Sequence, residues 1–286
     1  MSLEPRPAWP EPDSCSHIYD RVDREEHRYY RTPAGVFPGV TTVLKVLGLS
    51  REGLINWAVN LEREACLAAA VETFREAYSD RELGGVEWFE GAAEARLAGE
   101  RAHQRALQRA ADIGTQIHSR IRWFLARQVG QEAGECPVIS EAAARGYISF
   151  TDWWGRAGLK PIRVEQPVWH AVLGYAGTID LIAEDADGVV DVYDYKSGKG
   201  IYLEHHLQAR AYVEAARIWT PVRSANLIRL PKSVDDSFDE ARDIEELGDW
   251  QYGKRKQPFS EDELMAAFRA ALIAWTILRR RPEFAP

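Results

Sequence analysis

Two aspartates and a lysine stand on a pair of strands that the sequence predicts between residues 175 and 196. Every second residue of a strand shares a face, so Asp194 and Lys196 lie together on the second strand, and Asp180 lies on the first. Facing carboxylates and a lysine in an otherwise apolar strand pair are costly unless something uses them. Divalent metal binding is the obvious use, since hard oxygen ligands suit Mg²⁺ or Mn²⁺, which acidify water and stabilise phosphate charge.

Asp180 joins Asp194 only if the two strands pair residues of like parity. A three-residue loop over residues 186–188 gives such a register, with Gly188 in the left-handed conformation that this loop class needs. The resulting pairs are Glu184 with Val190, Ile182 with Val192, and Asp180 with Asp194. A two-residue Asp-Gly turn would place Asp180 opposite Tyr195 instead and break the site. We therefore predict the three-residue loop.

An Asp-x-Lys triplet is common, and alone it favours an ordinary surface hairpin. Its surroundings are more specific. The Asp180 strand carries Gly-x-x-Asp from Gly177, and the helix after Lys196 carries Gln208 and Tyr212, which share a helix face at a spacing of four. This order of elements resembles the RecB-type exonuclease branch of the PD-(D/E)XK nuclease superfamily. The resemblance implies a metal-dependent nuclease in which the Gln-Tyr face borders the active site.

The resemblance also implies roles for an upstream histidine and glutamate. His118 follows Gly114 in a Gly-x-x-x-His context, and the family places such a histidine on the metal with Asp180, Asp194 and the backbone carbonyl of Tyr195. An imidazole ligand makes Mn²⁺ a credible metal beside Mg²⁺. Glu165 is similar to the family's first-strand acid.

The residues themselves leave other interpretations open. His118 is spaced to pack with Ile121 and Leu125 on an apolar helix face, and Glu165 fits an ordinary exposed strand position. For His205 and His206, at the start of the Gln-Tyr helix, the sequence favours a solvated face.

The pattern of elements predicts a mostly helical first half and an α/β second half. The predicted elements include strands over 17–22 and 27–31, a short helix ending at Gly48, a long helix over 50–78, helices within 87–127 and a helix capped by Ser140. After these come strands from 162, 175 and 189, the Gln-Tyr helix, a strand over 225–230, an edge strand over 238–244 and a last helix capped by Ser260 and Glu263. We expect an α/β (α+β), restriction-endonuclease-like core, a mixed sheet flanked by helices, over 111–286. An N-terminal hairpin and helical extension over 1–110 would pack on it as one compact unit.

Composition excludes several classes of protein. The three cysteines, Cys15, Cys66 and Cys136, are widely spaced and form no zinc or iron–sulfur pattern, so we expect no iron–sulfur cluster. No apolar run could span a membrane. The N-terminal residues lack a secretory signal, so we expect a cytoplasmic protein of a bacterial or phage-infected cell. The net charge of −8 argues against a protein that coats nucleic acid nonspecifically, but a local basic surface suffices for a nuclease.

The sequence thus favours a DNA exonuclease that acts on single strands or strand ends. Residues 40–44 and 54–58 also resemble the helical region that caps the core of phage and mitochondrial genome maintenance exonucleases. An endonuclease on the same core remains open, and so does a catalytically silent DNA-binding subunit of a recombination or replication complex. The intact set of Asp180, Asp194 and Lys196 speaks against the silent subunit.

Overall fold

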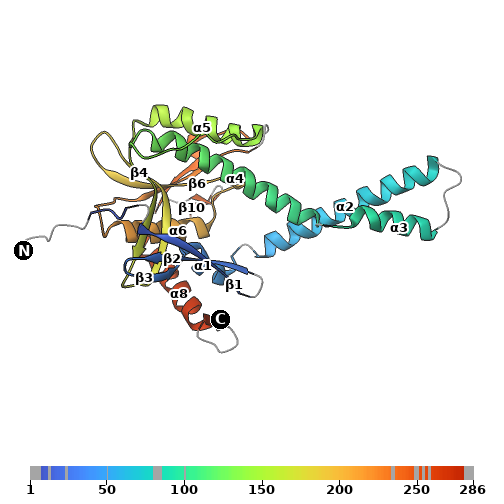
Figure 1. The fold of residues 1–286 in the computed structure, drawn as a ribbon, viewed down its shortest axis with the longest axis horizontal. Helices are drawn as coiled ribbons and strands as arrows, with labels where there is room; N and C mark the ends of the chain where they lie inside the picture. The colour runs from blue at the N-terminus through green and yellow to red at the C-terminus, as the bar shows by residue number, and fades with distance from the viewer. Residues whose placement is uncertain are drawn as a thin grey trace, which may run out of the picture. The chain divides into compact units, whose positions relative to one another are not determined.

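A five-stranded mixed sheet is the centre of the fold (Figure 1). The computed structural model describes residues 8–11, 14–22, 25–49, 51–79, 86–99, 101–232, 236–247, 251–252, 255–256 and 259–279. The sheet has the order β4-β5-β6-β7-β8, in which β6 and β7 are parallel and the other neighbours are antiparallel. Its strands are β4 (Lys160–His170), β5 (Tyr175–Glu184), β6 (Val190–Lys196), β7 (Ala225–Arg229) and β8 (Ile244–Glu246).

Helices cover both faces of this sheet, as the predicted α/β core requires. One face packs against α4 (Ala102–Ala126) and α5 (Glu141–Ala157), and the other packs against α6 (Leu203–Ala216), which in turn contacts α8 (Glu261–Arg279). Both faces are buried, so β6 reads as a nearly continuous buried run rather than an alternating one. The mixed α/β fold with a restriction-endonuclease-like sheet is confirmed.

The N-terminal segment adds a second, smaller sheet. It is an antiparallel meander of β1 (Ser16–Val22), β2 (Glu25–Thr32) and β3 (Gly35–Pro38). The predicted helix after it is α1 (Val40–Leu44) with a 3₁₀ turn, Lys45–Leu47, and it ends at Gly48 in the left-handed conformation. Gly39 also forms a parallel bridge to Ala176 of β5, which ties this segment to the large sheet.

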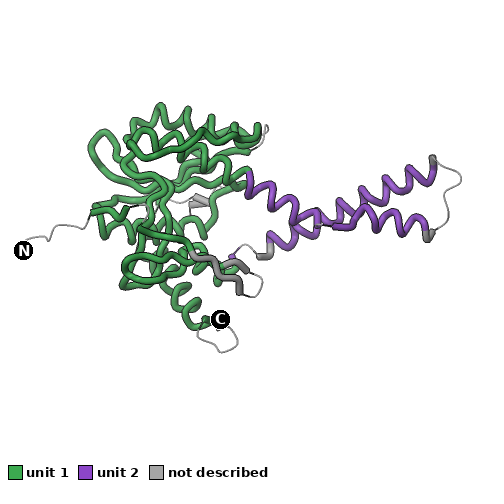
Figure 2. The backbone as a smooth tube through the Cα atoms, in the orientation of Figure 1, with its two compact units in different colours: residues 1–48, 113–286 green, residues 49–112 purple. Residues whose placement is uncertain are grey.

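The chain folds into two compact units (Figure 2). The first unit contains residues 1–48 and 113–286, and the second contains residues 49–112. The second unit is built from α2 (Arg51–Ser79), α3 (Val86–Leu97) and the beginning of α4. The first unit therefore holds the whole large sheet. The sequence-based division into 1–110 and 111–286 stays a prediction. No helix among the described residues is long and apolar enough to cross a membrane.

The predicted helix caps are present where the structure describes them. The Ser140 side chain accepts a hydrogen bond from the Ala143 amide at the start of α5. Ser260 and Glu263 form the predicted capping box of α8, with the Ser260 amide donating to Glu263 Oε2 at 2.8 Å and the Glu263 amide donating to Ser260 Oγ at 3.2 Å.

The edge strand predicted over residues 238–244 is mostly wrong. A one-turn helix, α7 (Glu240–Asp243), occupies most of that range, and strand β8 begins only at Ile244. The Asp239 side chain caps α7 by accepting from the Arg242 amide, a local bond that competes with strand pairing. The remaining described pair of strands is β9 (Gln251–Tyr252) with β10 (Arg255–Lys256).

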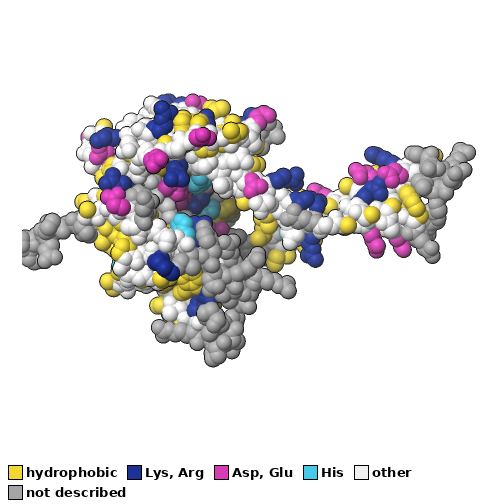
Figure 3. All heavy atoms as spheres, in the orientation of Figure 1, with side chains coloured by type: hydrophobic (Ala, Val, Ile, Leu, Met, Phe, Trp, Pro, Cys, Tyr) yellow, Lys and Arg dark blue, Asp and Glu magenta, His cyan; other side chains and the backbone are white. Residues whose placement is uncertain are grey.

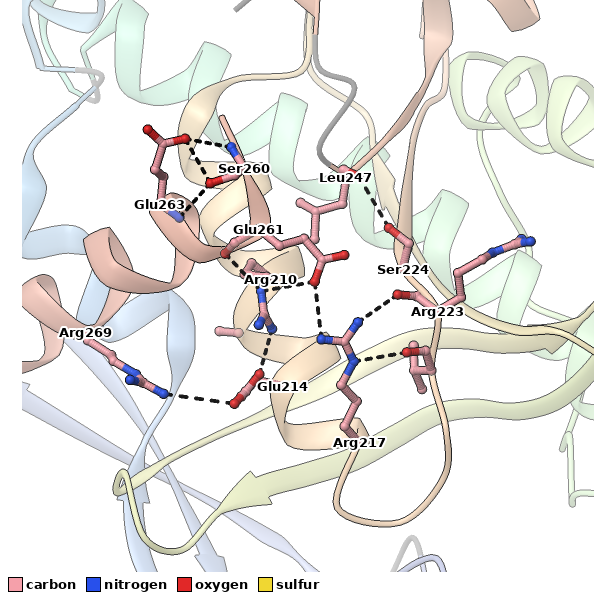
Figure 4. A network of polar contacts seen from close by, with 12 residues as sticks. Arg210, Glu214, Arg217, Arg223, Ser224, Leu247, Ser260, Glu261, Glu263 and Arg269 are labelled. Carbon is pink, nitrogen blue, oxygen red and sulfur yellow. Dashed lines mark hydrogen bonds and ion pairs between the residues drawn. The ribbon is translucent and has the colours of Figure 1, made fainter. Parts of the chain in front are cut away.

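Charged side chains fasten α6 to α8 (Figure 4). The buried Arg210 of α6 pairs with Glu214 at 2.9 Å and donates to the backbone carbonyl of Glu261 at 3.1 Å. Arg217, the C-cap residue of α6, donates to Glu261 Oε2 at 3.2 Å. Because α6 carries Gln208 and Tyr212, this network fixes the helix that faces the Asp-x-Lys strand.

Candidate active site

The Asp-x-Lys pair of β6 lies where strand periodicity predicts. Val192 packs in the core shared with α6, whereas Tyr193 and Tyr195 pack in the core shared with α4 and α5. Asp194 and Lys196 therefore face α6, and Lys196 Nζ lies 2.6 Å from Asp194 Oδ2. The Asp194 side chain is 2% exposed, so its charge is compensated within the protein rather than by bulk solvent.

The hairpin that brings Asp180 to this strand has the predicted three-residue loop. The Asp185 amide donates to the Val189 carbonyl at 3.0 Å, which encloses residues 186–188, and Gly188 has φ 77°. The predicted pairs Glu184 with Val190 and Ile182 with Val192 are both present. The backbone pairing of β5 with β6 ends at Leu181 and Tyr193, one position before Asp180 and Asp194.

Asp180 occupies the place where β5 and β6 stop pairing. Its Oδ2 accepts a hydrogen bond from the Tyr195 amide at 2.8 Å, so the side chain replaces a backbone partner for β6. Beyond this point, among the described strands, β6 pairs with β7 through Asp194 with Leu227 and Lys196 with Arg229. The carboxylate thus sits at a local opening of the sheet, beside the Asp-x-Lys residues.

Glu165 reaches the same place because β4 turns over there. It has φ 50°, the one positive φ of a non-glycine residue within the described part of the chain. On either side of it the strand changes faces: Val164 packs with the α4–α5 core and Val168 with the α6 core. The register of the neighbouring pairs sets Glu165 opposite Asp180. Left-handed backbone at a non-glycine residue is strained, and such strain clusters at functional sites.

His118 approaches this opening from α4. Its Nε2 lies 3.1 Å from the Tyr195 carbonyl, and its Nδ1 lies 3.6 Å from Asp180 Oδ2. Ligand atoms of His118, Glu165 and Asp180 all lie within 4.8 Å of one another. Ile121 and Leu125 of the same helix are buried in the core, and the His118 ring packs edge to face on the core residue Tyr195, with centroids 5.7 Å apart. His118 thus rests on the core through its ring and directs its nitrogens at Asp180 and the Tyr195 carbonyl.

Two groups of residues thus make up the centre. His118, Glu165 and Asp180 form a compact cluster, which we call the acidic cluster, with Tyr195 bound to it through its amide and carbonyl. Asp194 lies beside this cluster but is engaged by Lys196 and by Gln208, whose Nε2 is 3.3 Å from Asp194 Oδ1. Figure 3 shows histidine, acidic and basic side chains gathered in a hollow of the surface.

Gln208 and Tyr212 hold the Asp-x-Lys pair from α6. Lys196 Nζ donates to Gln208 Oε1 at 3.0 Å, and Gln208 Nε2 lies 3.1 Å from the Tyr212 hydroxyl. Tyr212 is buried, and its ring lies over Gly177 of β5, where an added Cβ would stand 2.3 Å from the ring. The glycine of Gly-x-x-Asp and the tyrosine of Gln-x-x-x-Tyr therefore fit each other.

A second glycine of the motif region has a similar role. Gly114, one turn before His118 on α4, is buried, and a Cβ there would stand 2.7 Å from Ser197 Oγ. The loop after β6 can therefore approach α4 closely, which helps to bring His118 next to Tyr195.

Burial and neighbouring charges shift the pKa values of the acidic groups in opposite directions. Burial and the Asp180 carboxylate raise the pKa of Glu165 to about 7. Burial also raises the pKa of Asp194 to about 6, in spite of Lys196. Burial alone would raise the pKa of Asp180, but His118, Lys196 and the Tyr195 amide outweigh burial and lower this pKa. Burial lowers the pKa of His118, yet the surrounding carboxylates more than reverse this and raise it to about 9.

These groups fit a divalent cation. Two carboxylates and an imidazole converge within 4.8 Å, with a third carboxylate beside them, and this is a donor set that Mg²⁺ or Mn²⁺ accepts. A cation among them would favour the ionised carboxylates and the neutral imidazole at once. The His118 ring, held between Asp180 and the Tyr195 carbonyl, is already oriented toward the carboxylates.

The sequence missed part of this arrangement. The positive φ of Glu165 has no sequence signal, because nothing but tertiary contacts holds a glutamate in that conformation. The solvated face favoured for His206 is wrong, because the side chain is fully buried with Nε2 3.0 Å from Glu245 Oε2 on β8. That partner lies 39 residues away along the chain, beyond the reach of local periodicity.

Comparison with known proteins gives the family. No curated protein matches the chain. Among solved structures, that of SSO0001 aligns over 61% of this chain and 77% of its own, with 14% identity and a TM-score of 0.29. The sequence profile of the PD-(D/E)XK nuclease superfamily matches residues 59–271, which include every residue of the site. The chain belongs to the PD-(D/E)XK nuclease superfamily.

Proposed function

We propose that this nuclease is a metal-dependent DNA exonuclease of the RecB-type branch that acts on single strands or strand ends. The observation that carries the proposal is the convergence of His118, Glu165 and Asp180 within 4.8 Å, directly beside the Asp194–Lys196 pair. Membership of the RecB-type branch is supported by Gln208 and Tyr212, which contact Lys196, Asp194 and Gly177.

The acidic cluster and Asp194 would hold Mg²⁺ or Mn²⁺, with the Tyr195 carbonyl as a further oxygen ligand. When bound, such a cation lowers the pKa of water and stabilises the negative charge that builds on a phosphate. The protein's own side chains fix the backbone of the site and orient the reacting groups. Asp180 keeps its bond to the Tyr195 amide and so fixes the end of β6.

Lys196 is the group that acts on the reacting atoms. Its ammonium is held by Asp194 and Gln208, and its charge also acts on Asp180 of the acidic cluster. From there it would orient the attacking water or offset charge on the phosphate. Gln208 and Tyr212 are positioning residues, because Gln208 bonds to Lys196 and Asp194, and the Tyr212 hydroxyl accepts a hydrogen bond from Gln208.

The test is a time course on end-labelled single- and double-stranded DNA with Mn²⁺, comparing the wild type with Lys196→Ala. We expect the variant to lose at least about a hundredfold in rate. Lys160→Ala is the matched control, because Lys160 is an exposed lysine paired with Glu184 at the far end of β4, and it should cleave like the wild type. Equal cleavage by Lys196→Ala would refute the site.

Two further outcomes separate the alternatives. Release of mononucleotides or short products from labelled ends, with circular single-stranded DNA left intact, identifies an exonuclease. Cleavage of the circle identifies an endonuclease on the same core. A protein that binds DNA but is inert with both Mg²⁺ and Mn²⁺ is a silent binding subunit.

A further inference from the structure

His205 lies on the same face of α6 as the residues that hold the Asp-x-Lys pair. His205, Gln208 and Tyr212 are spaced by three and four residues, so they form one row along the helix. Gln208, one turn after His205, touches Lys196, and the Lys196 charge also acts on His205. The histidine therefore stands at the end of that row, beside the catalytic lysine, and the proposed reaction does not use it.

The imidazole of His205 is held in one orientation and one protonation state. Its backbone amide donates to the Tyr202 carbonyl at 2.9 Å, and the Tyr202 amide donates back to His205 Nδ1 at 3.1 Å. Because Nδ1 is an acceptor, the proton of the neutral ring is on Nε2. Burial, Lys196 and His206 lower the pKa of His205 to about 3, so the ring stays neutral at physiological pH.

Nε2 is thus a fixed hydrogen-bond donor without a positive charge. Within the part of the chain that the structure describes, only Nδ1 of this ring has a protein hydrogen-bond partner. A metal ligand would need the lone pair on Nε2, which the Tyr202 bond makes unavailable. A ligand with acceptor oxygens suits such a donor, and phosphate oxygens are the acceptors that a nuclease substrate brings.

Tyr202 supplies an exposed aromatic ring next to this donor. The rings of Tyr202 and His205 pack edge to face with centroids 5.5 Å apart, and Tyr202 is 39% exposed. The tyrosines of β5, β6 and α6 are buried by contrast. Stacking of a nucleobase on an aromatic side chain is a common way to bind single-stranded nucleic acid.

We propose that Tyr202 and His205 form a nucleotide subsite beside the catalytic centre, in which His205 Nε2–H donates to a phosphate oxygen and the Tyr202 ring stacks on a base. The subsite rests on the proposed nuclease function and adds a substrate contact to it. It binds the single-stranded form, because a base inside a duplex is already stacked on its neighbours. Both residues position the substrate and do not take part in bond cleavage.

Binding is the readout that tests the subsite separately from catalysis. The dissociation constant of a fluorescent single-stranded oligonucleotide would be measured by anisotropy, with Ca²⁺ in place of Mn²⁺. We expect Tyr202→Ala and His205→Ala each to weaken binding about tenfold. Tyr202→Phe keeps the ring, and His205→Gln keeps both an amide donor and the ability to cap the helix, so each should stay within about threefold of the wild type.

A modified substrate separates substrate contact from helix capping. On an oligonucleotide with an abasic nucleotide at the stacked position, Tyr202→Ala should bind like the wild type, whereas a merely structural role would leave the tenfold difference in place. Tyr78→Ala, which removes an exposed tyrosine of α2, is the matched control and should bind normally. If Tyr202→Ala and His205→Ala bind the normal oligonucleotide like the wild type, the subsite is refuted, whatever the cleavage assay gives. Failure of cleavage with intact subsite binding would refute the proposed function alone.

Discussion

At the scale of single residues, the backbone of Glu165 decides how the acidic cluster forms. An extended glutamate at this position would continue the alternation of β4 and keep Val164 and Val168 on one face. The left-handed conformation instead turns the strand over and sets the carboxyl opposite Asp180. The strain is therefore tied to the placement of a functional group.

A pair of substitutions measures this strain. Glu165→Gly removes the steric conflict of a positive φ, whereas Glu165→Ala keeps it. Both variants lose the carboxyl, so their difference isolates the backbone. We expect the glycine variant to unfold at higher denaturant concentration, with a free energy of unfolding about 1 kcal/mol above that of the alanine variant. A more stable alanine variant would contradict the strained conformation.

Gly177 is a second position that shapes the site, because it leaves room for the Tyr212 ring. A Cβ at this glycine would stand 2.3 Å from the Tyr212 ring, which is buried in the core. Gly177→Ala should therefore lower the free energy of unfolding by about 2 kcal/mol. It should also reduce kcat, because a displaced Tyr212 releases Gln208 from Lys196.

Gly155→Ala on α5 is the control for this prediction. Nothing lies within 4 Å of a Cβ added there, and the position is exposed in a helix. This substitution should stabilise the protein by about 0.5–1 kcal/mol and leave kcat unchanged. Chemical denaturation and initial rates measure both effects. A Gly177→Ala protein with wild-type stability and rate would show that the contact is unimportant.

At the scale of elements, a buried network anchors the strand next to β6. Arg229, at the end of β7, pairs in register with Lys196. Its guanidinium donates to Asp243 Oδ1 at 2.6 Å and to both carboxylate oxygens of Asp236, at 2.6 and 2.9 Å. Asp243 also accepts from the Asp239 amide at 2.8 Å. The α7 turn, which stands where an edge strand was predicted, therefore places Asp243 next to the end of β7.

This network makes stability depend on pH. Burial alone would raise the pKa of Asp243, but bonds from Arg242, Arg229 and the Asp239 backbone outweigh it and lower the pKa. A carboxyl with a lower pKa in the folded chain stabilises the fold above its unfolded pKa, near 4, and this stabilisation is lost as pH falls through the folded value.

Asp243→Asn should therefore destabilise the protein most at neutral pH. We expect a loss of about 2 kcal/mol at pH 7, since Arg229 would lose its fully buried ionic partner and keep the partly exposed Asp236, and a shrinking difference from the wild type as pH falls below about 4. Thermal melts across pH 3–8 measure this. A difference that is constant with pH would mean that the asparagine acts through packing rather than through the lost charge.

At the scale of the whole molecule, the fold gathers negative charge that a cation would neutralise. The chain has a net charge of −8, and Glu165, Asp180 and Asp194 meet in a largely buried centre. Anything that binds the native state and not the unfolded chain stabilises the fold by mass action. Metal binding and global stability are therefore linked in this protein.

The melting temperature should consequently rise with Mn²⁺. At a free concentration one hundred times the dissociation constant, the gain is about 2.7 kcal/mol, which corresponds to a shift of several degrees. Asp180→Asn should abolish the shift, because Asp180 belongs to the acidic cluster. Asp187→Asn, an exposed carboxylate of the hairpin loop, should keep it. An equal shift in Asp180→Asn would place the metal elsewhere.

Local sequence patterns specify much of the geometry within and between neighbouring elements of the site. Strand alternation put Asp194 and Lys196 on one face, and the loop chemistry at Gly188 gave the register that brings Asp180 to them. Helix periodicity put Gln208 and Tyr212 on one face of α6. Each of these facts depends on residues close together along the chain, where a fixed period or turn type applies.

The residues that complete the site come from distant parts of the chain, and packing between elements brings them there. His118 lies 77 residues before Tyr195, and its approach depends on α4 packing against the sheet. The turn-over at Glu165 and the burial of His206 against Glu245 likewise depend on packing between elements. A strained backbone or a buried charge is held in position by the packing of the whole core. These placements therefore have no counterpart in a local sequence period.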